Sequence, residues 1–233
     1  KKEMSNPLKE LSRKEWCLWI GSLLIVTISN LAGRQLDYLT LVATWVGITS
    51  LIFAAKGNVI AQILMVVFSI LYGIISFHFR YWGEMLTYLG MTMPMAIWST
   101  ITWLSNPSKE KKGEVAIQQL TKKHIKALLF FSVLVTGIFY AVLWRLQTQN
   151  LFFSTLSVVT SFLAASLTML RSSYYAMAYA ANDLVLIVLW SLAAIKNPVY
   201  IPVIMNFSIF FINDTYGFLS WRKRERIQIS LAK

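Results

Sequence analysis

The sequence predicts an all-α membrane protein that crosses the bilayer eight times. Hydrophobic residues make up 57% of its 233 residues. They gather in segments that are each long enough to span the roughly 30 Å hydrocarbon layer as a helix. Six of these segments carry no charge and two carry one acid each: 16–33, 38–55, 57–79, 85–108, 127–144, 146–170, 174–195 with Asp183, and 199–221 with Asp214.

The basic residues predict which side of the membrane each end occupies. With eight crossings, 18 of the 22 Lys and Arg fall on the side that holds both termini, and 4 fall on the other. Because positively charged loops stay in the cytoplasm, we expect both termini to be cytoplasmic in a multi-pass protein of the plasma membrane, which in bacteria is the inner membrane. Anionic lipid headgroups attract such loops, so the net charge of +12 requires no nucleic-acid partner.

An internal repeat is also predicted. A shift of 118 residues places segments 38–55, 59–79 and 83–104 onto 156–173, 177–197 and 201–222 without a gap. Four crossings separate equivalent helices, so the two copies are parallel. The predicted division is a basic N-terminus with an extra helix (1–37), a first three-helix repeat (38–104), a basic cytoplasmic loop with a linker helix (105–150), a second repeat (151–221) and a basic tail (222–233). Paired repeats with a site at their interface are typical of transporters.

Polar residues deep in a span are candidates for a binding site. Asp183 lies about 13 Å along its helix, near the midplane, and Asn182 is beside it. A carboxylate at that depth is costly and is a functional candidate by default, although an interhelical hydrogen bond is the alternative role. Asp214 is expected in the inner third of its span, at a different depth from Asp183.

A helical stripe in the last span adds further candidates. Asn206, Phe210, Asn213 and Tyr216 follow at helical spacing, and stepping back by 118 residues gives aromatic positions in the fourth span. Ordinary packing is the alternative reading of such a stripe. The complete predicted substrate-binding set is Gln62, Tyr88, Trp98, Tyr179, Asn182, Asp183, Asn206, Phe210, Asn213 and Tyr216.

Motifs of enzymes, metal sites and cofactor sites are missing from the sequence. It has no Gly-rich phosphate loop, no His-Glu-x-x-His and no Gly-x-Ser-x-Gly. An intramembrane protease built on Asp183 and Asp214 would be a distant alternative, but neither aspartate lies in a Gly-x-Gly-Asp motif. We therefore expect no enzymatic activity, no cofactor and no metal.

Three segments resemble the Pnu family of vitamin and nucleoside transporters. They are Tyr-Trp-Gly-Glu-Met-Leu-Thr-Tyr-Leu-Gly-Met (81–91), Asn-Asp-Leu-Val-Leu-Ile-Val-Leu-Trp (182–190) and Phe-Phe-Ile-Asn-Asp-Thr-Tyr-Gly-Phe-Leu-Ser-Trp-Arg (210–222). The resemblance implies two three-helix bundles joined by a linker helix, related to the SWEET sugar transporters, with an extra N-terminal helix. It also implies a homotrimer, facilitated diffusion by alternating access, and a cytoplasmic kinase that traps the vitamin by phosphorylation.

Nicotinamide riboside is the substrate that this resemblance favours. The nicotinamide riboside members carry tryptophan shortly before the aspartate of the seventh span, whereas this chain has Tyr175 and Tyr179. Deoxynucleosides, thiamine and riboflavin therefore stay open as alternatives, and so does coupling to protons. We expect the substrate ring to stack on Tyr179, Phe210 or Trp98. No basic residue lies at that depth, so a nucleoside is expected rather than a nucleotide.

Overall fold

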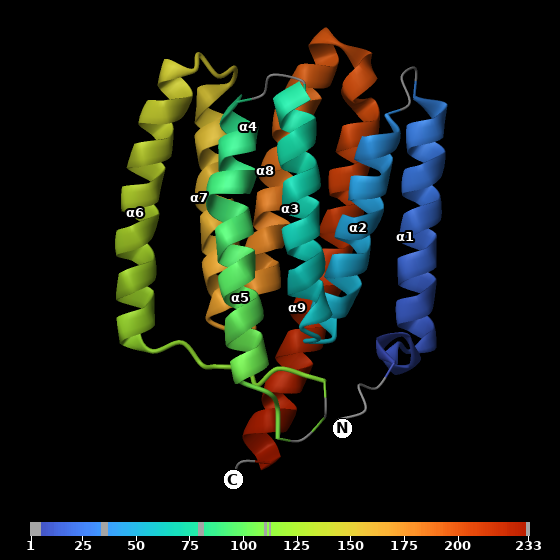
Figure 1. Ribbon diagram of the computed structural model, residues 1–233, viewed down its shortest axis with the longest axis vertical. Helices are drawn as coiled ribbons and strands as arrows, with labels where there is room; N and C mark the ends of the chain where they lie inside the picture. The colour runs from blue at the N-terminus through green and yellow to red at the C-terminus, as the bar shows by residue number, and fades with distance from the viewer. Residues whose placement is uncertain (1–5, 34–36, 79–81, 110, 112, 232–233) are drawn as a thin grey trace.

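A computed structural model describes residues 6–33, 37–78, 82–109, 111 and 113–231, and its helices run roughly along one common axis (Figure 1). The long helices are α1 (Arg13–Ala32), α2 (Tyr38–Ala55), α3 (Ile60–His78), α5 (Met93–Ser105), α6 (Lys122–Arg145), α7 (Leu151–Met169), α8 (Tyr175–Lys196) and α9 (Ile201–Leu231). The short ones are η1 (Pro7–Glu10), α4 (Trp82–Thr87), η2 (Tyr88–Thr92) and η3 (Pro198–Tyr200). The predicted all-α class is confirmed.

Within the described residues, 6 helices are long and apolar enough by themselves to cross a membrane, namely α1, α2, α3, α6, α7 and α8. The fourth predicted span corresponds to α4, η2 and α5 together. The eighth corresponds to α9, whose 31 residues include the charged turns near the C-terminus. The exact number of crossings stays a prediction. Six residues of the charge count lie outside the described residues: Lys1, Lys2, Arg34, Arg80, Lys112 and Lys233.

The fourth span contains a π-helical turn, η2, between α4 and α5. Pro94 follows directly, in the first turn of α5. Proline has no backbone N–H and its ring collides with the preceding turn, so an inserted residue in the helix accommodates it. The sequence predicted an unbroken helix here, because neither length nor apolarity signals a π turn.

The helices group into two three-element sets with two outer helices. α2 packs on α3 and α3 on α5, while α7 packs on α8 and α8 on α9. The two sets meet where α2 contacts α9 and where α5 contacts α7. α1 lies against α2 and α9, and α6 lies against α7 at the opposite edge of the bundle (Figure 1). Both chain termini lie at one end of the bundle, which we call the termini end, and the opposite end is the far end.

At the termini end the two sets exchange matching hydrogen bonds. The Trp103 indole donates to the Thr168 carbonyl at 2.9 Å, and the Trp221 indole donates to the Ala54 carbonyl at 2.7 Å. Both indoles are buried and their ring centroids are 5.4 Å apart. The donors are 118 residues apart, as predicted, but the acceptors are 114 apart. The gapless register therefore fails at the first helix of each set by about one helical turn.

The turns after α2 and α7 match at the same spacing of 114 residues. Gly57 has φ of 68° and Arg171 has φ of 54°, so each turn reverses through a left-handed residue. Beneath these turns, the segment after α5 covers the termini end. Arg224 of α9 pairs with Glu114 at 2.5 Å and donates to the Lys56 carbonyl at 2.6 Å. These contacts tie α9, the covering segment and the α2–α3 turn together.

Candidate functional site

A cavity of about 630 Å³ lies between the two sets of helices. One wall comes from α2, α3, α4 and η2, and the opposite wall comes from α7, α8 and α9. Residues of the far-end turns, including Gln147 to Asn150 and Lys196 to Asn197, line its outer part. No described residue of the termini-end turns lines it. The cavity thus opens toward the far end and is closed toward the termini end.

A group of aromatic side chains lies on the inner wall of the cavity. Phe68 and Tyr72 stand one turn apart on α3, with ring centroids 4.6 Å apart, and Tyr88 of η2 lies 5.2 Å from Tyr72. Phe210 of α9 meets Phe68 edge to face at 6.1 Å. Gly47 of α2 lets these rings approach the backbone, because a Cβ there would lie 2.8 Å from the Phe68 ring. Such a surface suits a flat aromatic ligand.

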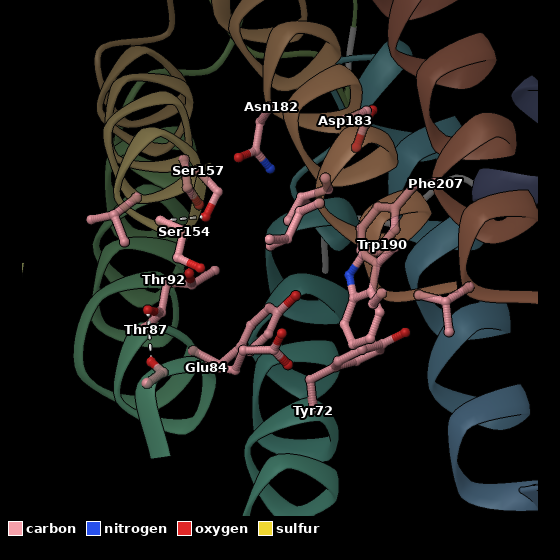
Figure 2. A pocket seen from close by; sticks show the side chains of 18 of the residues that line it. Tyr72, Glu84, Thr87, Thr92, Ser154, Ser157, Asn182, Asp183, Trp190 and Phe207 are labelled. Atoms are coloured by element: carbon pink, nitrogen blue, oxygen red, sulfur yellow. Dashed lines mark hydrogen bonds between the residues drawn. The ribbon is translucent and has the colours of Figure 1, made fainter. Parts of the chain in front are cut away.

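Asn182 supplies a hydrogen-bonding group to the same cavity. Thr160 of α7 donates to its Oδ1 at 2.8 Å, which fixes the orientation of the amide. The amide nitrogen then points into the open space between the helices (Figure 2). Asn182 can therefore donate to a carbonyl or hydroxyl oxygen of a ligand.

Three acids and one base are found among the described residues that line the cavity. Asp183 and Asp214 lie deep inside, Glu84 lies on α4 at the other end of the lining (Figure 2), and Lys196 is the last residue of α8. Asp183 is thirteen residues before Lys196, and Asp214 is thirteen residues after Ile201, the first residue of α9. Both are thus equally far from the far-end turn, on two helices that pack against each other. The prediction that the two aspartates lie at different depths was wrong. It counted the depth of Asp183 from the cytoplasmic end of its span and the depth of Asp214 from the outer end of the next.

Five of the ten predicted site residues line this cavity, and one face of α9 holds three of the others. The five are Tyr88, Tyr179, Asn182, Asp183 and Phe210. Asn206, Asn213 and Tyr216 lie instead on a face of α9 that contacts α1.

Three hydrogen bonds connect that face to α1. Asn30 donates to Asn206 Oδ1 at 3.0 Å, and Asn213 donates to Ser22 Oγ at 3.0 Å. The Tyr216 hydroxyl donates to Glu15 Oε1 at 2.9 Å. We call these three pairs the α1–α9 ladder. The polar stripe predicted in the last span is therefore one face of α9, but it packs against α1 and does not line the cavity.

The last two predicted residues also lie outside the lining. Gln62 is buried near the start of α3, and Trp98 of α5 is 59% exposed on the outside of the bundle. Conversely, the sequence reading missed Phe68, Tyr72, Phe207 and Trp190 as lining residues, and it did not include Asp214 or Glu84 in the site. The spacing of Phe68 and Tyr72 at i and i+4 was the available signal, but apolar aromatics at that spacing also occur in ordinary packing.

A bundle of membrane-length helices with a polar, aromatic cavity closed at one end defines a class of protein: a multi-pass membrane transporter. The family model described as "Nicotinamide mononucleotide transporter" matches residues 37–223, which is most of the chain. The chain belongs to this family. Its fold and its relatives are those of a transporter and not of an enzyme.

Two curated relatives carry the name "Nicotinamide riboside transporter PnuC". The protein from Neisseria mucosa is 24% identical over 191 residues, which cover 80% of this chain and 73% of the relative. The protein from Haemophilus influenzae is 21% identical over 207 residues, 88% of each chain. A solved structure titled "Crystal structure of the Vitamin B3 transporter PnuC" has a TM-score of 0.80 and 22% identity, with 94% of each chain covered. That similarity shows the same fold.

Proposed function

We propose that this protein transports nicotinamide riboside across the membrane by alternating access. The observation that carries the proposal is the cavity itself, which combines stacked aromatic rings, an oriented amide and buried acids. Nicotinamide riboside is a flat cationic ring with a carboxamide and an uncharged sugar, so each of its parts has a matching group there. The names of the two relatives support the same substrate.

The charges in the cavity favour the riboside over the mononucleotide. Among the described residues of the lining, Asp183, Asp214 and Glu84 are acids and Lys196 is the one base. Lys196 is about 20 Å along α8 from Asp183, so it cannot reach a phosphate held near that residue. A phosphate would lose its hydration next to carboxylates, which is strongly unfavourable. A nucleotide is therefore a poor ligand, although the family's description names one.

The binding mode follows from the positions of the lining groups. The pyridinium ring lies against Tyr88, Phe210 or Tyr179, where cation–π attraction adds about 0.5 to 2 kcal/mol. Asn182 donates to the carboxamide or to a ribose oxygen, and Asp183 accepts from ribose hydroxyls. Of the predicted site residues we retain Tyr88, Tyr179, Asn182, Asp183 and Phe210, and we assign Asn206, Asn213 and Tyr216 to helix packing.

In transporters built from internal repeats, alternating access comes largely from rocking of one repeat against the other around the site. The reciprocal bonds of Trp103 and Trp221 and the matched turns at Gly57 and Arg171 support a parallel repeat of two three-helix units. We propose that Trp103, Trp221 and Tyr175 form the gate on the cytoplasmic side, with eight crossings and both termini in the cytoplasm. The cavity of this structure then faces outward.

The remaining features of the proposal come from the family resemblance. We propose facilitated diffusion without proton coupling, with uptake made irreversible by a cytoplasmic kinase that phosphorylates the substrate. We also propose a homotrimer with a fold related to the SWEET transporters. α6 contacts the rest of the bundle mainly through α7 and exposes large apolar side chains such as Phe130, Val133 and Trp144, so it has a surface available for lipid or for another protomer.

Transport by purified protein in liposomes tests this proposal. Labelled nicotinamide riboside should enter protein-containing liposomes, reach the outside concentration and stop, and excess unlabelled riboside should compete. The mononucleotide should not compete at equal concentration. Thiamine, riboflavin and deoxynucleosides serve as the alternative competitors, and stronger competition by any of them would replace the proposed substrate. Accumulation above the outside concentration under a proton gradient would contradict uniport.

A further inference from the structure

The two buried aspartates of the cavity come from different helices and meet at one depth. Asp183 of α8 and Asp214 of α9 are each only 4% exposed, and both line the cavity. α8 and α9 pack against each other, and both aspartates lie thirteen residues from the turn that joins these helices. A single buried acid often has a structural partner, but here the neighbour of each acid is another acid.

No described basic side chain compensates this pair. The ion pairs among the described residues join Glu15 to Lys56, Glu114 to Lys111 and Arg224, and Glu225 to Arg222. All of them lie at the termini end, outside the cavity. One carboxylate oxygen, Asp183 Oδ2, is buried without a hydrogen-bond partner. The surroundings are aromatic, with Tyr88, Tyr179 and Phe210 on the same lining.

Two neighbouring buried carboxyl groups favour a positive group between them. Two neighbouring carboxyl groups repel each other when both are charged, and burial removes the water that would screen them. A cation between them relieves the repulsion, while a neutral ligand of the same shape leaves it in place. Discrimination by a buried charge that only the correct ligand can satisfy is a strong form of specificity.

We propose that Asp214, together with Asp183, makes the cavity select a positively charged heteroaromatic ring over an uncharged one. The inference rests on the proposed function and deepens it, because it names the residue that sets the charge preference. It separates the cationic candidates, nicotinamide riboside and thiamine, from the neutral ones, riboflavin and deoxynucleosides. Asp214 is the part of this pair that the sequence reading left out of the site.

The test compares two ligands of nearly the same size that differ in charge, and the Asp214 variants separate the effect of charge from that of the added hydride. Nicotinamide riboside is cationic, and its reduced dihydropyridine form keeps the sugar and the carboxamide but is neutral. Binding of both to the purified full-length protein is measured by calorimetry for the wild type, Asp214→Asn, Asp214→Glu and Asn182→Ser. Asp214→Asn keeps the shape and removes the charge, Asp214→Glu keeps the charge, and Asn182→Ser shortens a hydrogen-bonding side chain. Thermal melting of each variant checks that it is folded.

The wild type is expected to bind the cationic form at least tenfold more tightly than the neutral form. Asp214→Asn should reduce that preference at least tenfold, mainly by weakening the cation. Asp214→Glu should retain the preference, and Asn182→Ser should weaken both forms equally. If Asp214→Asn unfolds, Asp183→Asn replaces it with the same expected loss of preference.

Two results would contradict the role of Asp214, and a third would contradict the proposed substrate itself. A preference that survives in the folded Asp214→Asn variant, or an equal loss for both ligands, shows that Asp214 does not select for charge. A wild type that binds neither form refutes nicotinamide riboside as the substrate.

Discussion

Replacing Trp221 by phenylalanine should loosen the closed termini end. The indole of Trp221 is fully buried, donates to the Ala54 carbonyl at 2.7 Å and packs on Tyr175 with ring centroids 4.7 Å apart. Phenylalanine removes the hydrogen bond, which is worth about 1 kcal/mol net, and part of the ring contact, worth about 1 kcal/mol more. The total of about 2 kcal/mol shifts the ratio of closed to open states roughly 30-fold.

Accessibility of a buried cysteine measures that shift. Ser99 of α5 is 1% exposed and lies one turn from Trp103, toward the cavity. With Cys17 first changed to Ser, a Ser99→Cys reporter should react slowly with a membrane-impermeant thiol reagent added from the termini side. Trp221→Phe should raise that rate about 10- to 30-fold, in keeping with the shift in populations.

A matched control is available on α6. Trp144 is 64% exposed at the end of that helix, so Trp144→Phe removes an indole without touching the closed end. It should leave the reporter's reaction rate unchanged. An unaltered rate in a monodisperse Trp221→Phe protein would refute the assignment of Trp221 to the gate.

Three further predictions follow from other parts of the structure. Asn213→Ala and Tyr216→Phe should each lower the free energy of unfolding by about 1 kcal/mol, because their hydrogen bonds go to α1. Each should change the affinity for the riboside less than threefold. A large loss of affinity with an unchanged melting temperature would show that these residues belong to the binding site. Gly47→Ala should weaken riboside binding about tenfold, because its Cβ would lie 2.8 Å from the Phe68 ring. Gly21→Ala is the control and should leave binding unchanged, because nothing lies within 4 Å of its Cβ. Calorimetry measures the affinity of both variants. A cysteine added after residue 233 should resist labelling from outside intact cells, and strong labelling there would contradict a cytoplasmic C-terminus.

Span positions were predictable because the bilayer imposes length and apolarity on each helix independently of its neighbours. A charge-free segment of about twenty residues needs no knowledge of its partners to be recognised. The π turn at Tyr88–Thr92 was not predictable in this way, because it depends on local strain near Pro94 and leaves apolarity unchanged.

The site could be predicted only in part, because a helical pattern does not say which neighbour it faces. Asn182 and Asp183 were found from their depth, which is set by the chain alone. The stripe on α9 had the right spacing for a ligand surface, yet Asn206, Asn213 and Tyr216 face α1. Asp214 was misplaced relative to Asp183 because depth was counted from opposite ends of two antiparallel helices.

The α1–α9 ladder also constrains how the protein is assembled in the membrane. Glu15, Ser22 and Asn30 are buried polar residues of the first helix, and each has a hydrogen bond to a residue of the last helix. During synthesis α1 precedes α9 by about 170 residues. Until α9 is inserted, these side chains lack their hydrogen bonds to it, and an unsatisfied polar group in lipid is costly. A chain that stops before α9 therefore exposes the polar face of α1 to the bilayer. A quality-control factor that binds polar groups in lipid could distinguish such an incomplete chain from the complete protein.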